Sequence, residues 1–128
     1  MLNKNIIFTL EKKNRMKNDL TWHDFEKVEI RAGTILEVAD FPEARKPAYQ
    51  LTIDFGAEIG ILKSSAQIMA RYSKENLVDR QIVAVVNFPK KQIGKFMSEC
   101  LVLGAMASAK DIVLLSTDFV VENGTRIG

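Results

Sequence analysis

Two alternating stretches decide the fold: VEIRAGTILEV at residues 28–38 and YQLTIDF at residues 49–55. Successive strand side chains point to opposite faces, so alternation predicts a half-buried strand. In the second stretch Leu51, Ile53 and Phe55 share the apolar face. In the first, with Ile35 as the exception, one face holds Val28, Ile30, Ala32, Thr34, Leu36 and Val38.

Four further apolar segments predict short strands, and Gly33 predicts a bulge or bend in the first strand. The segments are EIGILKSS (58–65), QIVAVVNF (81–88), ECLVLGA (99–105) and DIVLLS (111–116). The second and third are almost continuously apolar, which is typical of strands buried on both sides.

Helical structure is expected only in short turns. Thr21 followed by Asp24 resembles a capping box and predicts one turn over residues 22–27. A second turn is expected within residues 66–80, and ENGT at 122–125 predicts a tight turn.

Five or six short strands without a β-α-β rhythm predict an all-β protein, a small OB-fold: a five-stranded Greek-key barrel with short helical turns. Residues 18–128 form this one domain. Residues 1–17 are rich in Lys and Asn without sustained periodicity, and predict a flexible extension with a possible short helix. Met16 is an alternative start.

The residue inventory does not indicate catalysis. His23 is the only histidine, which excludes a histidine-based metal cluster, and no phosphate-binding glycine motif occurs. Cys100 stands in an apolar segment, where a thiol is usually a small hydrophobe. We therefore predict a protein that is not an enzyme and has no metal or cofactor.

No apolar segment approaches the roughly 20 residues that span a bilayer. A single cysteine cannot form an internal disulfide, and it fits a reducing compartment. We expect a cytoplasmic protein without membrane insertion.

Charge is distributed unevenly, although the net charge is only +2. Residues 63–95 carry seven basic and two acidic side chains, while residues 21–62 carry four basic and eight acidic ones. This layout is the footprint of a phosphate-binding face. The alternative is that the charges are scattered over the solvated surface.

Two predicted loops carry groups suited to RNA. KSSAQI at 63–68 offers hydroxyls, an amide and an ammonium, and NFPKKQIGKFMS at 87–98 adds three lysines, an amide and an aromatic ring. Cations bind the backbone, amides and hydroxyls bind base edges, and rings stack on bases. Alternatively, the lysines only confer solubility.

Five motifs in order carry a family resemblance. They are IRAGTI (30–35), FPEAR (41–45), KSSAQI (63–68), VVNFPKKQIGKFMSECLVLGA (85–105) and NGTRIG (123–128). From about Asp24 to Gly128 the chain resembles the CsaA family of small secretion-associated chaperones, part of a wider tRNA-binding-domain group. The resemblance implies an OB-fold homodimer that binds unfolded or precursor polypeptides in protein export. The wider group binds tRNA largely by shape and backbone.

Carried over by position, the resemblance implies these RNA-binding residues: Lys63, Ser64, Ser65, Gln67, Asn87, Lys90, Lys91, Lys95, Met97, Ser98 and Glu99. Glu99, being acidic, is expected to accept hydrogen bonds from base or sugar groups. Lysine stands where RNA-binding relatives commonly hold arginine, so fewer bidentate contacts and a modest affinity are expected.

A polypeptide site needs exposed apolar loop residues. The candidates are Phe41, Phe88, Ile93, Phe96 and Met97, with Pro42 and Pro89 beside them. The alternative is that Phe88 and Phe96 fold back to plug the barrel mouth. The closing segment, residues 111–128, holds more apolar residues than one edge strand needs, which predicts an obligate dimer.

Two hypotheses follow, and they differ in their response to salt. The first is a chaperone that holds polypeptides in an apolar groove, and the second is a tRNA- or structured-RNA-binding module acting in translation. RNA binding weakens steeply with salt, whereas capture of an apolar segment does not.

Overall fold

The computed structural model describes residues 18–128; the extension predicted for residues 1–17 lies outside the described residues. The helical turns are α2 (Trp22–Glu26), α3 (Gly56–Ile59) and α4 (Lys74–Leu77). The strands are β1 (Ile30–Asp40), β2 (Tyr49–Asp54), β3 (Ile61–Ala66), β4 (Gln81–Val85), β5 (Lys91–Ile93), β6 (Phe96–Ser98), β7 (Leu101–Val102), β8 (Gly104–Met106), β9 (Ile112–Leu114) and β10 (Arg126–Ile127).

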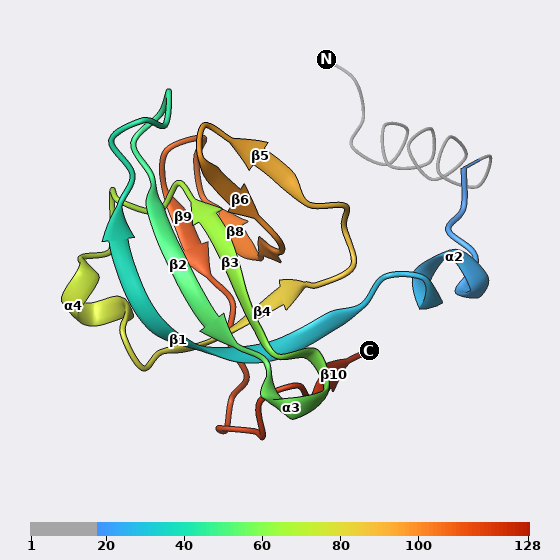
Figure 1. Ribbon diagram of the computed structural model, residues 1–128. Coiled ribbons are helices and arrows are strands. Elements are labelled where there is room, and N and C mark those ends of the chain that lie inside the picture. The colour runs from blue at the N-terminus through green and yellow to red at the C-terminus, as the bar shows by residue number, and fades with distance from the viewer. Residues whose placement is uncertain (1–17) are drawn as a thin grey trace, which may run out of the picture.

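The main sheet runs in the order β3-β2-β1-β4-β7, with β10 also paired to β1, and every pairing is antiparallel. β1 is long and strongly curved, so it pairs with β2 along one half and with β4 along the other (Figure 1). The prediction of a small all-β OB-fold is confirmed.

The barrel closes between β3 and the segment that leads into β7. The Glu99 backbone N–H donates to the Lys63 carbonyl at 2.7 Å, and the Lys63 N–H donates back to Glu99 Oε1 at 3.1 Å. Next to them, the Ser65 N–H donates to Ser98 Oγ at 3.2 Å. These bonds satisfy the edge of β3 that β2 leaves open.

A bulge in β1 corrects the predicted face of that strand. The register shifts between Ile35 and Glu37, so Leu36 is the extra residue. Ile35, just before the extra residue, is paired with the buried Ile53 and is itself fully buried, whereas Leu36 is 39% exposed. The prediction that Leu36 joins the buried face was wrong, because the core face of β1 runs through Gly33 and Ile35 before the bulge. The extra residue then returns Val38, which is paired with the buried Leu51, to that face.

Gly33 is not the bulge but lies against the core. A Cβ placed on it would come within 2.7 Å of the Phe55 ring, so the residue is small because β1 and that ring approach closely.

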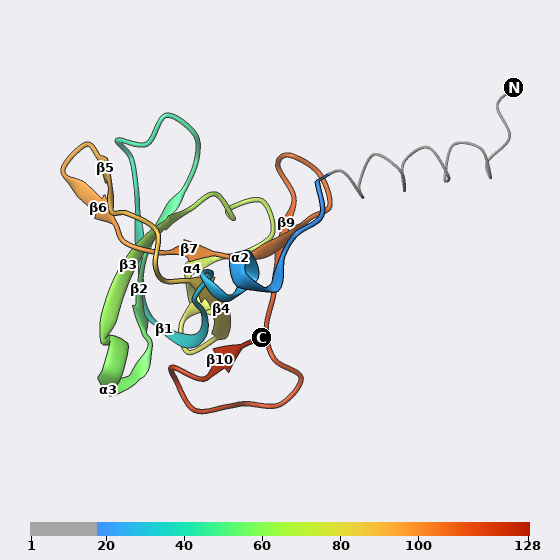
Figure 2. The ribbon, with the colours of Figure 1, turned by 90° about the vertical axis from the view of Figure 1, so that its right-hand side faces the viewer.

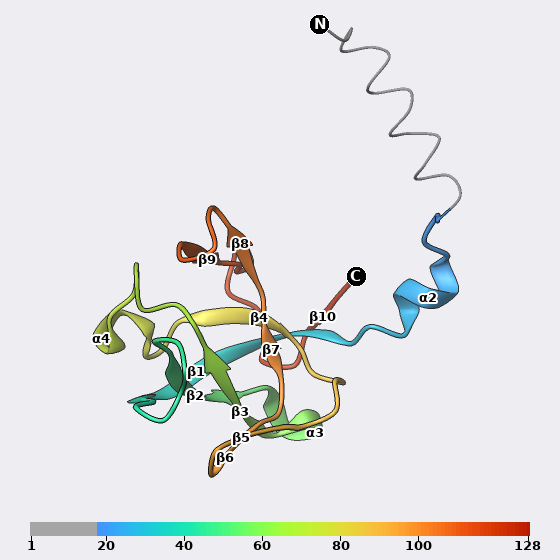
Figure 3. The same cartoon turned by 90° about the horizontal axis from the view of Figure 1, so that it is seen from above.

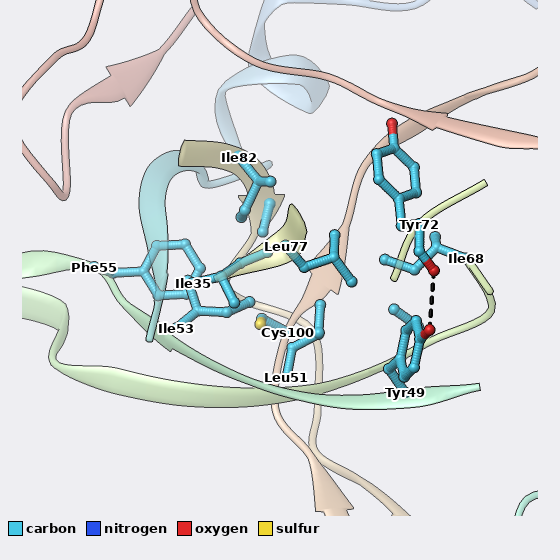
Figure 4. Close-up of a cluster of buried hydrophobic side chains, with 12 residues drawn as sticks. Ile35, Tyr49, Leu51, Ile53, Phe55, Ile68, Tyr72, Leu77, Ile82 and Cys100 are labelled. Carbon is cyan, nitrogen blue, oxygen red and sulfur yellow. Dashed lines mark hydrogen bonds between the residues drawn. The ribbon is translucent and has the colours of Figure 1, made fainter. Parts of the chain in front are cut away.

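The core fills the barrel interior from several strands and turns. Figure 4 shows Ile35, Leu51, Ile53 and Phe55 packed with Leu77 and Ile82, all of them fully buried. At one end the Tyr49 hydroxyl donates to the Tyr72 carbonyl at 2.9 Å, and the Tyr72 hydroxyl accepts the Leu114 N–H at 2.9 Å. These bonds tie β2, the connection before α4, and β9 together.

The predicted turns are confirmed by their caps. Thr21 Oγ1 accepts the Asp24 N–H at 3.0 Å at the start of α2. The Thr125 N–H donates to the Glu122 carbonyl at 3.1 Å in the turn before β10. α4 begins with a capping box that the sequence prediction had not identified, formed by Ser73 and Asn76.

Of the two segments predicted to be strands buried on both sides, only the first forms one buried strand. In β4, residues 82–85 are all buried, as predicted. Residues 99–105 are not one buried strand: they divide between β7 and β8, and Leu101 is 48% exposed. The chain turns there because β8 leaves the barrel to pair with β9 in a separate hairpin.

Gly33→Ala is expected to lower the free energy of unfolding by about 1–3 kcal/mol, because the added methyl group overlaps the Phe55 ring. Urea denaturation measures the change. Gly128→Ala is the control, since no atom within 4 Å meets its Cβ. A Gly33→Ala protein as stable as the control would contradict the close packing.

Candidate functional site

Two projections flank the outer face of β2 and β3 at one end of the barrel. They are the loop of residues 41–48, between β1 and β2, and the hairpin formed by β5 and β6. Both extend from the same end of the molecule (Figures 1 and 2). They frame the face on which OB-folds hold their ligands.

The β5–β6 hairpin turns through Gly94 and Lys95, between the paired residues Ile93 and Phe96. Gly94 has a φ of +59°, which glycine adopts readily at the first central position of such a turn. Alternation places Ile93 and Phe96 on one face, where both are half-buried, and Met97 on the other, 38% exposed.

An apolar hollow of about 510 Å³ lies between the two projections. It is lined by Phe41, Glu43, Gln50, Gly94, Lys95 and Phe96. The rings of Phe41 and Phe96 meet edge to face with their centroids 5.2 Å apart. Phe41 is only 4% exposed, so it supports the ring of Phe96 from behind.

A more polar hollow of about 380 Å³ lies on the strands beside it. Its lining consists of Glu37, Val38, Ala39, Gln50, Thr52, Lys63 and Phe96. Gln50 and Phe96 line both hollows. The two hollows therefore adjoin at these side chains, and we call them together the groove, with an apolar end and a polar end.

The predicted RNA-binding residues separate by exposure. The exposed ones are Lys63, Gln67, Asn87, Lys90, Lys91, Lys95 and Met97, and the half-buried ones are Ser65, Ser98 and Glu99. Ser64 is fully buried and its hydroxyl donates to the Ser65 carbonyl. A ligand on the surface does not reach the Ser64 side chain in this structure, so we do not include Ser64 among the residues proposed to contact RNA.

Asn87 and Glu99 have structural contacts that sequence reasoning missed. The Asn87 amide donates to the Lys27 carbonyl at 2.6 Å and accepts the Glu29 N–H at 3.0 Å, which fixes the chain between α2 and β1. Glu99 closes the barrel through Lys63, and its Oε2 lies 3.3 Å from Lys90 Nζ. That ion pair holds the start of the basic hairpin against the barrel.

Of the predicted polypeptide-binding residues, the structure brings Phe41 and Phe96 into contact and leaves Ile93 on the same face of the hairpin as Phe96. Phe88 is 55% exposed in the β4–β5 connection and lines neither hollow described above. Met97 is on the far side of the hairpin. Phe96 does fold back partly, whereas Phe88 does not plug the barrel.

Four polar lining residues were not predicted as site residues: Glu37, Glu43, Gln50 and Thr52. Gln50 and Thr52 alternate with the buried residues of β2, so the sequence indicated their outward direction. The bulge at Leu36 turns Glu37 to the same face.

Cys100 lies beneath this site and is not a reactive thiol. Burial raises its pKa to about 12, and the neighbouring Glu99 carboxylate adds to the shift. The thiol is therefore protonated at neutral pH, and it lies 3.8 Å from the Lys63 carbonyl.

Within residues 18–128, no three His, Cys, Asp or Glu side chains gather as metal ligands. In the same part of the chain, no helix has the length and apolar character needed to cross a membrane.

Residues 30–126 match the family described as "Putative tRNA binding domain". A crystal structure of the chaperone CsaA from Bacillus anthracis str. Ames is 49% identical, with a TM-score of 0.81 over 85% of this chain and 98% of that one. A CsaA chaperone protein from Picrophilus torridus is 50% identical, with a TM-score of 0.79 over 85% and 99%.

A methionine–tRNA ligase from Bdellovibrio bacteriovorus is 34% identical over 109 residues, which are 85% of this chain. The match spans only 16% of the ligase, so the likeness concerns one domain of that enzyme.

Proposed function

This chain belongs to the tRNA-binding-domain family and, within it, to the CsaA group; from that premise we propose that it is a chaperone that binds unfolded or precursor polypeptides. We place this activity in the cytoplasm, before protein export. The family consists of binding domains and not of catalysts, so the proposed activity is binding of a polypeptide without a chemical reaction.

The apolar hollow is the observation that carries the proposal. Phe96 presents a half-buried ring there, and the buried ring of Phe41 supports it. Gly94, in the turn of the same hairpin, adds no side chain to the lining, so an extended segment can lie close to the hairpin backbone. Glu43, Gln50 and Lys95 supply polar groups around the apolar surface. Apolar capture with a polar rim suits a polypeptide of variable sequence.

Phe96→Ala is expected to weaken binding of a reduced, alkylated and permanently unfolded polypeptide by roughly tenfold, because most of the apolar contact is lost. Met97→Ala is the matched control: Met97 is adjacent in sequence but faces away from the hollow. Fluorescence anisotropy measures both affinities, and thermal unfolding confirms that both variants are folded.

Moderate salt is expected to leave the affinity for the polypeptide nearly unchanged. Equal loss of affinity in Phe96→Ala and Met97→Ala, with both proteins folded, would contradict the assignment of the hollow.

RNA binding is a second candidate, favoured by the cations around the same groove. Lys63 stands in the polar hollow and Lys95 lines the apolar one. Lys90 and Lys91 are exposed at the start of the hairpin. Such cations, above a floor of amide and hydroxyl groups, suit a phosphate backbone whose bases lie on the sheet.

Replacing Lys91 by Glu is expected to weaken tRNA binding at physiological salt while sparing the polypeptide, because Lys91 is exposed and, unlike Lys90, forms no ion pair within residues 18–128. Each neutralised phosphate makes the slope of log affinity against log salt more negative by roughly 0.7–0.9. Binding of tRNA by the wild-type protein is therefore expected to weaken steeply as salt rises. Lys110→Glu makes the same change in net charge at another exposed lysine that forms no ion pair within residues 18–128. Equal loss of tRNA affinity in the two variants would show that only net charge matters.

We further infer a homodimer, because large apolar side chains remain exposed in the C-terminal third of the chain. Met106 is 75% exposed, Phe119 80% and Val120 89%. The β8–β9 hairpin, which carries Met106, lies on the opposite side of the barrel from the β5–β6 hairpin (Figure 3). A second copy can cover this surface without blocking the groove.

Light scattering is expected to give a mass of twice 14.4 kDa. Phe119→Asp is expected to shift the protein toward a single chain. Ile61→Asp, at an apolar position on β3 that is 58% exposed, is expected to leave the mass unchanged. A wild-type protein with the mass of one chain at micromolar concentration would refute the dimer.

A further inference from the structure

The floor of the polar hollow is a row of side chains across three strands. Glu37 on β1 is paired with Thr52 on β2, which is paired with Lys63 on β3. Neighbouring strands lie about 4.8 Å apart, so the backbones that carry Glu37 and Lys63 are roughly 10 Å apart. Gln50 stands in the next outward row of β2, and the ring of Phe96 forms a wall.

These polar side chains have no partner within the described residues. Glu37 and Lys63 are not joined to each other or to any other residue of 18–128 by an ion pair. The hydrogen bonds of Lys63 to Glu99 and Cys100 use its backbone alone, which leaves the ammonium group free above a fixed strand. In the same part of the chain, the side chains of Gln50 and Thr52 make no hydrogen bond.

The ligand that satisfies this row must offer donors at one side and acceptors at the other. A phosphate does not fit the Glu37 end, because two anions repel. An aliphatic side chain would displace water and leave Glu37 and Lys63 without partners, which is costly. A planar ring with polar edges suits both the row and the Phe96 wall, since bases stack on aromatic side chains.

Guanine matches the row better than the other bases. Its N1–H and N2 amino group present two donors on one edge, which a carboxylate accepts together. Its O6 and N7 atoms present acceptors on the adjoining edge, within reach of a long ammonium side chain. Adenine lacks the paired donors and O6, uracil offers only one N–H, and cytosine offers a single N4 amino group without a neighbouring ring N–H.

We propose that the Glu37–Thr52–Lys63 row, walled by Phe96, is a seat for one unpaired guanine of a bound RNA. Glu37 accepts from the N1 and N2 donors, Lys63 donates to O6 or N7, and Phe96 stacks on the ring. The proposal rests on the RNA-binding candidate above and shares Phe96 with the polypeptide site. It adds base selection to contacts that would otherwise depend on phosphate charge alone.

The test compares three short single-stranded RNAs of one length: uracil only, uracil with one central guanine, and uracil with one central inosine. Wild-type protein is expected to bind the guanine RNA about tenfold more tightly than the uracil RNA, as one bidentate contact allows. Inosine lacks the N2 amino group, so its RNA is expected to lose most of that preference. The preference is expected to persist as salt rises, because the three RNAs carry equal phosphate charge.

Glu37→Gln is expected to remove the guanine preference and leave the affinity for the uracil RNA unchanged or slightly raised. Glu43→Gln is the matched control, since Glu43 lines the apolar hollow instead. Thermal unfolding confirms that both exposed substitutions leave the fold intact. The same preference in wild type, Glu37→Gln and Glu43→Gln would overturn the seat.

The other outcomes separate the seat from the functions on which it depends. Salt-steep binding of all three RNAs with equal affinity would overturn the seat while RNA binding itself stands. Binding of none of them would overturn both. If Glu37→Gln weakens polypeptide binding and changes no RNA affinity, the row belongs to the polypeptide site and the proposal is wrong.

Discussion

The reciprocal bonding between Lys63 and Glu99 is the constraint on which the rest of the site depends. It closes the barrel edge of β3, and through the Glu99–Lys90 ion pair it also fixes the start of the basic hairpin. Because the backbone of Lys63 is fully used in this closure, its ammonium group projects from a rigid position. The same closure buries Cys100, whose raised pKa keeps the thiol inert.

One aromatic residue, Phe96, contributes to both the apolar and the polar hollow of the groove. Phe96 lines the apolar hollow with Phe41 and also forms a wall of the polar hollow above Gln50. A polypeptide and an RNA chain would each use this ring, the first by apolar burial and the second by stacking. Burial dominates at one end, where Gly94 leaves space beside the rings, and charge dominates at the other, where Lys63 is unpaired.

Local patterns predicted most of the elements, whereas long-range contacts decided the roles of the residues. The segment 87–98 was predicted as a loop, and it instead contains the paired strands β5 and β6. Alternation identified β2 and its buried face, and Thr21 identified the start of α2. The bulge at Leu36 was hidden because an inserted residue leaves the apolar content unchanged. From the sequence, Asn87 and Glu99 look like polar residues of loops. Yet the hydrogen-bond partners of Asn87 are 58 and 60 residues away in sequence, and the partner of Glu99 is 36 residues away. No local signal reveals such partners.

The most direct test of the account is a nuclear magnetic resonance titration of the labelled protein with an unfolded polypeptide at moderate salt. The account predicts shifts at the ring protons of Phe41 and Phe96 and at the amides of Gln50, Gly94 and Lys95, all of which line the apolar hollow. The signals of Met106 on β8 are expected to stay in place. Shifts centred on Met106 or Phe88, with Phe96 unchanged, would contradict the groove as the site of capture.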